Sequence, residues 1–366
     1  MAWANLDLAA LYNNVNYIVR MVGTTQVMAV VKANGYGHGA VEVARVALEA
    51  GATRLGVAHV HEGIALRQAG IQVPVQVFRN FELGHINEYL NYNLEITLSS
   101  ENAIRQLLSH PASEKPFPVH IKIDTGMNRL GLRAATFAKQ AAELLRHRKL
   151  SILGIMTHFA TADETDHEFL KSQLRCFKKI MDLPVLQGRD ILYHAANTAA
   201  TLKHPETWLN LVRTGIGMYG YPPTQEMAGT SPFKPVLSLH ARLAQIKQIL
   251  PGETVSYNRT WTALQPTFIG TVDIGYGDGY PRALSNKMQV LVNGRRAAIV
   301  GTVCMDMLMV DLGEQPQDQP GDEVVLLGKQ GHDEIPIWDF CDHLGTIPYE
   351  ITCMISQRVQ RNYTER

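Results

Sequence analysis

The sequence has no long hydrophobic run and no N-terminal targeting pattern. No stretch approaches the roughly 18 apolar residues of a membrane span. The first residues, MAWANLDLAALYNNV, contain no basic segment followed by an apolar one, as a secretory signal would require. We therefore expect a cytoplasmic protein without a membrane partner.

The chain also has no formal net charge at pH 7. The 34 Lys and Arg residues balance the 34 Asp and Glu residues, and no basic tract is present that would follow a phosphate backbone. This balance argues against nucleic acid as a partner.

Cysteine is scarce. The chain has four cysteines in 366 residues, and no two of them form a C-x-x-C pair. Neither a disulfide framework nor a structural metal site is predicted. We expect the four thiols to be mostly buried.

The chain does contain many short apolar runs rich in Val and Ile. Each is followed by a segment with helical spacing of apolar residues. The predicted strands are Gln26–Lys32, Arg54–Val60, Val73–Phe78, Leu94–Leu98, Pro118–Asp124, Ile152–His158, Ile191–Asn197 and Asn210–Ile216. Continuous apolar strands that alternate with helices predict an α/β fold with a parallel sheet, and eight units are what a (β/α)8 TIM-type barrel needs. A doubly wound open sheet has the same alternation but rarely needs eight units.

The pattern changes after a stretch rich in Pro and Gly, Tyr219–Pro235. Mostly strand-like runs follow, and Asn293-Gly294 is placed for a two-residue hairpin turn. We expect a (β/α)8 barrel at 8–232 and a mainly antiparallel β domain at 233–366, to which residues 1–7 add a strand before Asp7 caps the first helix. Two helical patterns, Ile337–Leu344 and Glu350–Arg361, close the chain.

In a (β/α)8 barrel, reactive groups cluster where the strands end. Lys32 ends the first predicted strand and precedes a glycine-rich segment, ANGYGHG. A lysine that leaves an apolar strand is partly desolvated, which lowers its pKa and suits it to Schiff-base chemistry. An isolated lysine at such a position is more often an ordinary surface residue. Whether Lys32 belongs to a functional site therefore depends on the residues that end the other strands.

Polar or glycine-rich segments end four further strands. They are DTGMNRLG from Asp124, His158, Asn197-Thr198, and RTGIGMYG from Arg213. Taken singly, His158 is more often a satisfied core histidine, Arg129 a solvated loop charge and Asn197 a helix N-cap. Together they predict one site at the barrel mouth.

The last of these segments, Gly215–Gly220, satisfies G-x-G-x-x-G, but it is not followed by the helix of a dinucleotide fold, because Pro222-Pro223 comes directly after it. Barrels often bind phosphate after strands seven and eight. A phosphorylated ligand is therefore expected, with Thr198 as a hydroxyl donor.

At this point the sequence resembles the alanine racemases, along essentially the whole chain. The segments that carry the resemblance are Ala29–Gly39, Lys122–Gly131, Thr157–Ala160, His194–Asn197, Val212–Arg213, Gly215–Ile216, Val255–Tyr257, Ile274–Tyr276, Cys304–Asp306 and Gly345–Glu350. The segments after position 250 distinguish this family from single-barrel proteins that bind the same cofactor.

The resemblance implies a pyridoxal 5'-phosphate enzyme that interconverts L-alanine and D-alanine and supplies D-alanine for peptidoglycan. Lys32 is implied to carry the cofactor as a Schiff base and to act as one base, with Tyr257 as the second. Two bases are needed because the Cα proton leaves one face of a planar carbanion and returns to the other. His158 is implied to support Tyr257 and to connect it to Arg213, which faces the pyridine nitrogen.

The remaining site residues are also implied by the resemblance. Arg129 and the backbone N–H of Met305 are expected to bind the substrate carboxylate, and Lys122 is carbamylated in many relatives. Asp306 is expected to support the site. The expected cofactor-binding residues, besides Lys32 and Arg213, are Tyr36, Asn197, Thr198, Gly215, Ile216 and Tyr349.

The family also implies a homodimer in which Tyr257 and Met305 complete the partner's site. Two alternatives stay open: a serine or broad-specificity racemase with the same machinery, and a non-catalytic cofactor-binding protein. Tyr349 favours alanine, because a bulky phenol beside a small substrate leaves more room for a methyl than for a hydroxymethyl group. Four positions depart from the common family pattern, namely Thr198, Trp261, Gly277 and Met307.

Overall fold

The structure is a computed structural model, and it describes residues 2–111 and 115–364. The chain forms two compact units. One consists of residues 11–35 and 40–233, and the other of residues 1–10, 36–39 and 234–366.

The first unit is a barrel of parallel strands. Eight of them follow one another in the order β10-β2-β3-β4-β5-β6-β8-β9. Their bounds are β2 Gln26–Val30, β3 Arg54–Val57, β4 Val75–Asn80, β5 Glu95–Leu98, β6 Phe117–Asp124, β8 Leu150–Met156, β9 Leu192–His194 and β10 Leu211–Thr214. The short strand β7, Leu132–Arg133, pairs with the end of β6. Backbone bonds from Asn210 to Tyr193 and from Arg213 to Ala196, 3.1 and 3.0 Å long, close the ring between β9 and β10.

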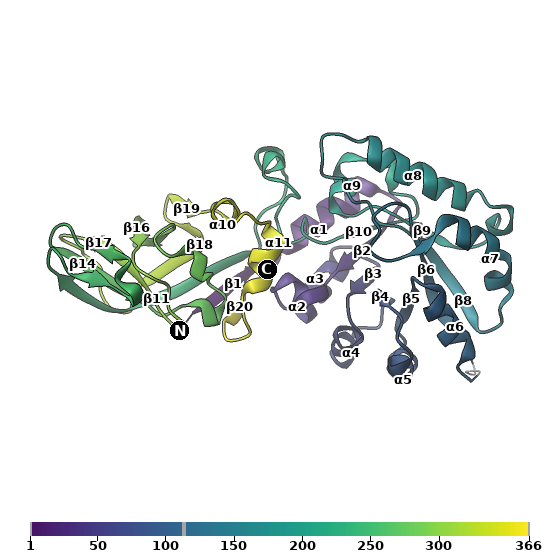
Figure 1. Ribbon diagram of the computed structural model, residues 1–366, viewed down its shortest axis with the longest axis horizontal. Coiled ribbons are helices and arrows are strands. Elements are labelled where there is room, and N and C mark those ends of the chain that lie inside the picture. The colour runs from purple at the N-terminus through teal and green to yellow at the C-terminus, as the bar shows by residue number, and fades with distance from the viewer. Residues whose placement is uncertain (1, 112–114, 365–366) are drawn as a thin grey trace. The chain divides into compact units, whose positions relative to one another are not determined.

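Helices follow seven of these strands and surround them in Figure 1. They are α3 Ala40–Glu49, α4 Val60–Gln68, α5 Ile86–Asn91, α6 Glu101–Ser109, α7 Ala134–Arg146, α8 Glu168–Met181 and α9 Thr198–Lys203. An earlier helix, α1 Leu8–Val22, lies beside the segment after β10, where the Asn14 amide donates to the Met218 carbonyl at 3.1 Å. The described barrel thus has helices outside and strands inside.

The strands form because most of their side chains are apolar and both faces of the strands are buried. All four residues of β3 and all four of β5 are buried, and Leu55, Val57, Ile96 and Leu98 have no exposed surface. Burying each such side chain contributes about 1.5–3 kcal/mol. The predicted (β/α)8 barrel is confirmed. Several strands end earlier than predicted, because the polar residues after them form turns or cap helices.

The second unit is built on an antiparallel sheet. Strands β11, β14, β17, β16, β15 and β18 pair in that order, and β18 pairs again with β11, so these six strands form a closed ring. Their bounds are β11 Leu237–Ile249, β14 Thr267–Val272, β15 Gln289–Val292, β16 Arg295–Ile299, β17 Leu308–Gly313 and β18 Glu323–Gln330. Smaller elements complete the unit: β12 Thr254–Val255, β13 Trp261–Thr262, β19 Asp333–Ile335, α10 Ile337–Leu344 and α11 Pro348–Met354. The predicted mainly antiparallel β structure is confirmed.

Both ends of the chain contribute to this sheet. Strand β1, Trp3–Asp7, pairs antiparallel with β11 and parallel with β20, Gln360–Thr364. The Asp7 carboxylate then accepts the Ala10 N–H at 2.8 Å and caps α1. The helix predicted at Glu350–Arg361 is wrong beyond Met354, because residues 360–364 find partners in β1.

The expectation of mostly buried thiols is also wrong. Of the four cysteines, which are all thiols, only Cys341 is buried, while Cys353 is exposed. Within the described ranges, every helix is too short or too polar to cross a membrane.

The hairpin turn at Asn293-Gly294 was predicted and is confirmed between β15 and β16. Both residues have positive φ, 50° and 75°. A Cβ at Gly294 would meet only the Gln330 carbonyl oxygen, at 4.0 Å. The cost of a side chain here is therefore almost entirely a backbone cost.

We predict that Gly294→Ala lowers the free energy of unfolding by about 1–2 kcal/mol, because an L-residue is strained in the left-handed region. Gly84→Ala is the matched control, since Gly84 has no atom within 4 Å of its added Cβ and its φ is not positive. Urea titration of both variants is the measurement. Equal stabilities of the two variants would contradict the account of the turn.

Candidate active site

Lys32 lies just after β2, half-buried, at the start of an unusual turn. The four residues that follow it, 33 to 36, all have positive φ between 52° and 61°. They form one left-handed turn, closed by a 2.9 Å bond from the Gly35 N–H to the Val31 carbonyl. Left-handed conformation costs non-glycine residues about 1–2 kcal/mol each. Other contacts must therefore hold this turn.

Glu62, on α4, supplies those contacts. One carboxylate oxygen accepts the Ala33 N–H at 2.6 Å, and the other accepts the N–H groups of Ala58 and His59 at 2.7 and 2.9 Å. The Asn34 side chain accepts the Ala40 N–H at 3.1 Å. The carboxylate of Glu62 thus fixes the backbone that leaves Lys32 and the end of β3 together.

Arg213, on β10, is a buried guanidinium whose acceptors within residues 2–111 and 115–364 are all neutral. It donates to the carbonyls of Thr157 and Ala195 at 2.8 and 3.1 Å, and to Nδ1 of both His158 and His194 at 3.1 Å. Burial lowers the pKa of Arg213 to about 9, so the side chain stays protonated at neutral pH. Because Arg213 only donates, each histidine must offer a bare Nδ1 and carry its proton on Nε2.

Positive charges crowd this end of the barrel. Burial, followed by the charges of Arg129 and Arg213, lowers the pKa of Lys122 to about 8. Burial and then Arg213 and Lys122 hold the pKa of His158 well below its usual value, so His158 is neutral. The charge of Lys32 contributes to both shifts. The site therefore favours anionic ligands.

The segment after β10 lies against the start of α9. The Gly215 N–H donates to the Thr198 hydroxyl at 3.1 Å, and Asn197 caps α9 by accepting the Ala200 N–H at 3.0 Å. A Cβ at Gly217 would lie 2.9 Å from the Thr198 methyl group, so only glycine lets the two segments approach. Thr198 and Ile216 are both buried, and Thr198 contacts the segment that contains Ile216, so these two strand ends are neighbours as predicted.

Arg129 lies in a loop after β6 that Asp124 organises. The Asp124 carboxylate accepts the N–H groups of Gly126 and Asn128, both at 3.0 Å. Behind the loop, the buried Gln173 donates to the Thr125 hydroxyl at 3.2 Å and to the His158 carbonyl at 3.1 Å. Arg129 itself is exposed.

In the second unit, Tyr257 lies in a tight turn and is 69% exposed. Ser256 and Asn258, on either side of it, have positive φ. The Ser256 hydroxyl donates to the Thr302 carbonyl at 2.6 Å, and the Thr302 hydroxyl donates to the Tyr257 carbonyl at 2.9 Å. These bonds hold the turn while leaving the phenol exposed.

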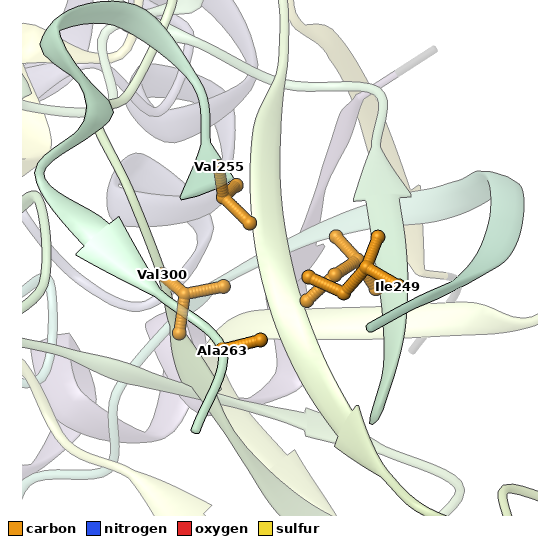
Figure 2. Close-up of a cluster of buried hydrophobic side chains, with 5 residues drawn as sticks. Ile249, Val255, Ala263 and Val300 are labelled. Carbon is orange, nitrogen blue, oxygen red and sulfur yellow. The ribbon is translucent and has the colours of Figure 1, made fainter. Parts of the chain in front are cut away.

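A small apolar cluster anchors the strand that leads into this turn. Its buried members are Ile249, Val255, Ala263, Ile269 and Val300. Figure 2 shows the labelled side chains gathered around one space, with Val300 next to Ala263 and Val255 above them. The cluster therefore fixes the backbone two residues before Tyr257.

Met305 and Asp306 lie in a second exposed turn of this unit. The Met305 carbonyl accepts the Gly277 N–H at 2.8 Å, and Asp306 pairs with Arg358 at 2.6 Å. A Cβ at Gly277 would lie 2.3 Å from the Arg358 guanidinium, so glycine leaves room for this ion pair.

Tyr36 and Tyr349 form a pair in the same unit, with ring centroids 6.0 Å apart. Burial and then the neighbouring Tyr349 raise the pKa of Tyr36, so its phenol stays protonated and can donate a hydrogen bond.

The predicted site residues thus form two groups. The barrel brings together Lys32, Lys122, Arg129, His158, Asn197, Thr198, Arg213, Gly215 and Ile216, and the second unit carries Tyr36, Tyr257, Met305, Asp306 and Tyr349. Sequence reasoning missed Glu62, Gln173 and His194, each of which has at least one partner more than ten residues away in the chain. Only His194 left a signal, since it lies in a matching segment, HAAN.

Comparison with known proteins identifies the class of this fold and site. The family models for the alanine racemase N-terminal and C-terminal domains match residues 6–223 and 236–363. A barrel and β unit that match these two models define an amino-acid racemase of the pyridoxal-phosphate-dependent kind.

Individual relatives agree. The alanine racemase of Desulforamulus reducens is 42% identical over 366 residues, which cover 99% of this chain and 98% of that protein. That of Halothermothrix orenii is 40% identical and covers 100% of this chain and 97% of its own length. The crystal structure of alanine racemase from Bacillus anthracis with bound L-Ala-P is 38% identical, with a TM-score of 0.93 and coverage of 100% and 95%. The chain belongs to the alanine racemase family.

We predict that Glu62→Gln loosens the backbone after Lys32. An amide keeps one acceptor oxygen but turns N–H donors toward N–H groups, so at least one of the three bonds is lost. The free energy of unfolding should fall by about 1–3 kcal/mol, and hydrogen exchange at Ala33 and His59 should accelerate. Glu88→Gln, at an exposed 3.6 Å pair with His85, is the control. Unchanged exchange at Ala33 would contradict the role of Glu62.

Proposed function

We propose that this protein interconverts L-alanine and D-alanine with Lys32 and Tyr257 as two opposed bases, on pyridoxal 5'-phosphate held by Lys32. The observation that carries the proposal is the crowd of cations around Lys32 and the buried Arg213, on a chain that matches the family throughout.

The residues of the barrel fit this cofactor. The lowered pKa of Lys122, caused by burial and by neighbouring cations, supports a site that favours an anion. Pyridoxal 5'-phosphate carries a phosphate group, and the amino-acid substrate carries a carboxylate. The Thr198 hydroxyl and the N–H groups at Gly215 and Ile216 would hold the phosphate, beside Asn197 at the start of α9, with Tyr36 and Tyr349 as further donors.

The bound cofactor would supply an electron-withdrawing system that acidifies the Cα–H bond of the amino acid. Arg213 would face its ring nitrogen. Because a guanidinium donates and keeps its own proton, this nitrogen would remain unprotonated and the ring would be a weaker electron sink than with an Asp partner. Restrained withdrawal of electrons favours return of the proton over side reactions.

Lys32 and Tyr257 would handle the proton. The Lys32 amine takes it from one face of Cα or returns it there, and the Tyr257 phenol does the same at the opposite face. His158 would assist Tyr257. Since Arg213 occupies Nδ1 of His158, the Nε2–H group is the one left to donate to a phenolate oxygen.

Arg129 and the Met305 N–H would bind the substrate carboxylate, with the turn at Met305 steadied by the ion pair of Asp306 and Arg358. Lys122 would carry a carbamate that orients Arg129. Its pKa near 8 supports this, because carbamylation needs a neutral amine and the added negative charge would relieve the crowded cations.

Catalysis would require a homodimer. Tyr257 and Met305 are 69% and 53% exposed, and apolar side chains at such exposure are suited to a partner surface. We also propose 8–232 and 233–366, with 1–7 attached to the second, as the domains. Cytoplasmic location and a role in supplying D-alanine for peptidoglycan stay predictions.

We predict that Tyr257→Phe lowers the racemisation rate by about 100-fold or more, since one acid–base group is lost. Lys32→Ala should abolish both racemisation and covalent cofactor binding. Chiral assay of D-alanine from L-alanine, with L-serine as the competing substrate, is the measurement. A wild-type protein that binds the cofactor and racemises no amino acid would overturn the proposed function, and preference for serine would correct the substrate.

Mixing two inactive variants tests the shared site. In a Lys32→Ala and Tyr257→Phe heterodimer, sites built across the interface leave one site intact, so random mixing should restore about a quarter of wild-type activity. Sites contained within one chain would leave the mixture inactive. The control is mixing either variant with itself.

Carbamylation of Lys122 predicts a carbamate carbon signal in the NMR spectrum after incubation with ¹³C-bicarbonate. The signal should be stronger at pH 9 than at pH 7, because the amine loses its proton as the pH rises through about 8. Lys122→Arg should remove the signal and Lys139→Arg, at an exposed lysine, should leave it. A signal that survives Lys122→Arg would contradict the assignment.

A further inference from the structure

Polar side chains cross the apolar interior of the barrel and end at Arg213. They are Arg54 on β3, Glu95 on β5, His120 on β6 and His194 on β9. All four are at most 8% exposed, and both histidines have no exposed surface. Buried polar groups in a barrel core are costly unless each is hydrogen-bonded. Here each of these side chains forms a hydrogen bond with the next one in space.

The links of this chain are close and continuous. Arg213 Nη1 lies 3.1 Å from His194 Nδ1, His194 Nε2 lies 3.1 Å from His120 Nδ1, and His120 Nε2 lies 3.1 Å from a Glu95 carboxylate oxygen. At its far end, Glu95 also accepts two hydrogen bonds from Arg54. The five residues form a path from one cation to another through one carboxylate.

Only one arrangement of protons satisfies these links. Arg213 must donate, so His194 accepts at Nδ1 and carries its proton on Nε2. His194 then donates to His120, which accepts at Nδ1 and donates from Nε2 to Glu95. A doubly protonated His120 would set two N–H groups against each other, so both rings are neutral. Every donor in the path points toward Glu95.

The backbone makes room for the middle of this path. A Cβ at Gly154, on β8, would lie 2.4 Å from Nδ1 of His120. Gly154 has no positive φ, so its backbone does not need glycine. The need comes mainly from the imidazole that lies against it, and also from the Leu192 carbonyl oxygen, which would lie 2.9 Å from the same Cβ.

We propose that Glu95, His120 and His194 are positioning residues for Arg213: their one-way hydrogen-bond path fixes the acceptor to which the guanidinium donates and so orients it. This role rests on the proposed placement of Arg213 against the cofactor's ring nitrogen. In the described part of the chain Arg213 contacts no carboxylate, and Glu95, two imidazoles away, is the anion to which its bonds lead.

Substitutions at His120 distinguish positioning from packing. Glutamine can accept from His194 through its carbonyl and donate to Glu95 through its amide, whereas leucine fills space and does neither. We expect His120→Leu to lower kcat about tenfold, the cost of one hydrogen bond to a charged group, with KM for alanine changed less than twofold. His120→Gln should keep most of kcat. Gly154→Ala should resemble His120→Leu, since it displaces the ring.

Thr97→Val is the matched control. Thr97 is fully buried in the same barrel and bonds Gln76 and the Val77 carbonyl, outside the path. It should leave kcat and the cofactor dissociation constant unchanged, whereas His120→Leu should raise that constant. Equal losses for leucine and glutamine, or the same loss in Thr97→Val, would overturn the proposal.

Wild-type protein gives an independent readout that needs no core substitution. In protein with ¹⁵N-labelled histidine, the His194–His120 bond should give a scalar coupling between two ring nitrogens, with both rings neutral and protonated at Nε2. Absence of that coupling in the folded protein would overturn the path itself. If cofactor were not attached at Lys32, the proposed function would fail while the coupling remained, so the two failures are distinguishable.

Discussion

The site depends on a buried arginine that contacts no anion among the residues that the structure describes. Arg213 is held by two backbone carbonyls and two imidazoles, all of them neutral. An isolated buried charge is costly, and it persists only where each of its donors has an acceptor. The histidines beside it are therefore held in one tautomer. Its charge also lowers the pKa values of His158 and His194, although burial is the larger cause.

The requirement that Arg213 keeps its proton and only donates has consequences both for the bound ligand and for the barrel core. Toward the ligand, under the proposed function, a cation that keeps its proton would restrain the withdrawal of electrons by the cofactor. Toward the core, the path through His194 and His120 leads to Glu95. Burial alone would raise the pKa of Glu95, but the His120 hydrogen bond and the Arg54 charge lower it overall, so the carboxylate stays ionised. One side chain thus links the electronics of the site to the packing of the barrel.

Much of the fold follows from local sequence. The eight barrel strands were predicted because buried parallel strands are continuous apolar runs, and the hairpin at Asn293-Gly294 because both turn residues tolerate positive φ. Strand β20 was missed because its residues become a strand only by pairing with β1, at the other end of the chain. The spacing of apolar residues within 350–361 cannot predict a pairing with a strand at the other end of the chain.

The residues of the candidate site also fall into those that local sequence predicted and those that depend on distant partners. Lys32, Arg213 and Thr198 were found because they follow apolar strands or belong to segments that resemble a family. The left-handed turn after Lys32 was not, since Ala33 and Tyr36 disfavour that conformation and Glu62, 29 residues after Ala33, imposes it. His120 and Glu95 were missed for a related reason. Each lies in a strand among apolar neighbours, and its role depends on partners that only the closed barrel supplies.

The most direct measurement is the protonation state of the ring nitrogen in the bound cofactor. Wild-type protein loaded with pyridoxal 5'-phosphate that carries ¹⁵N in the ring can be observed by NMR. If Arg213 remains the cationic donor, the nitrogen should have the chemical shift of an unprotonated acceptor of a hydrogen bond. The chemical shift of a pyridinium nitrogen would contradict the account.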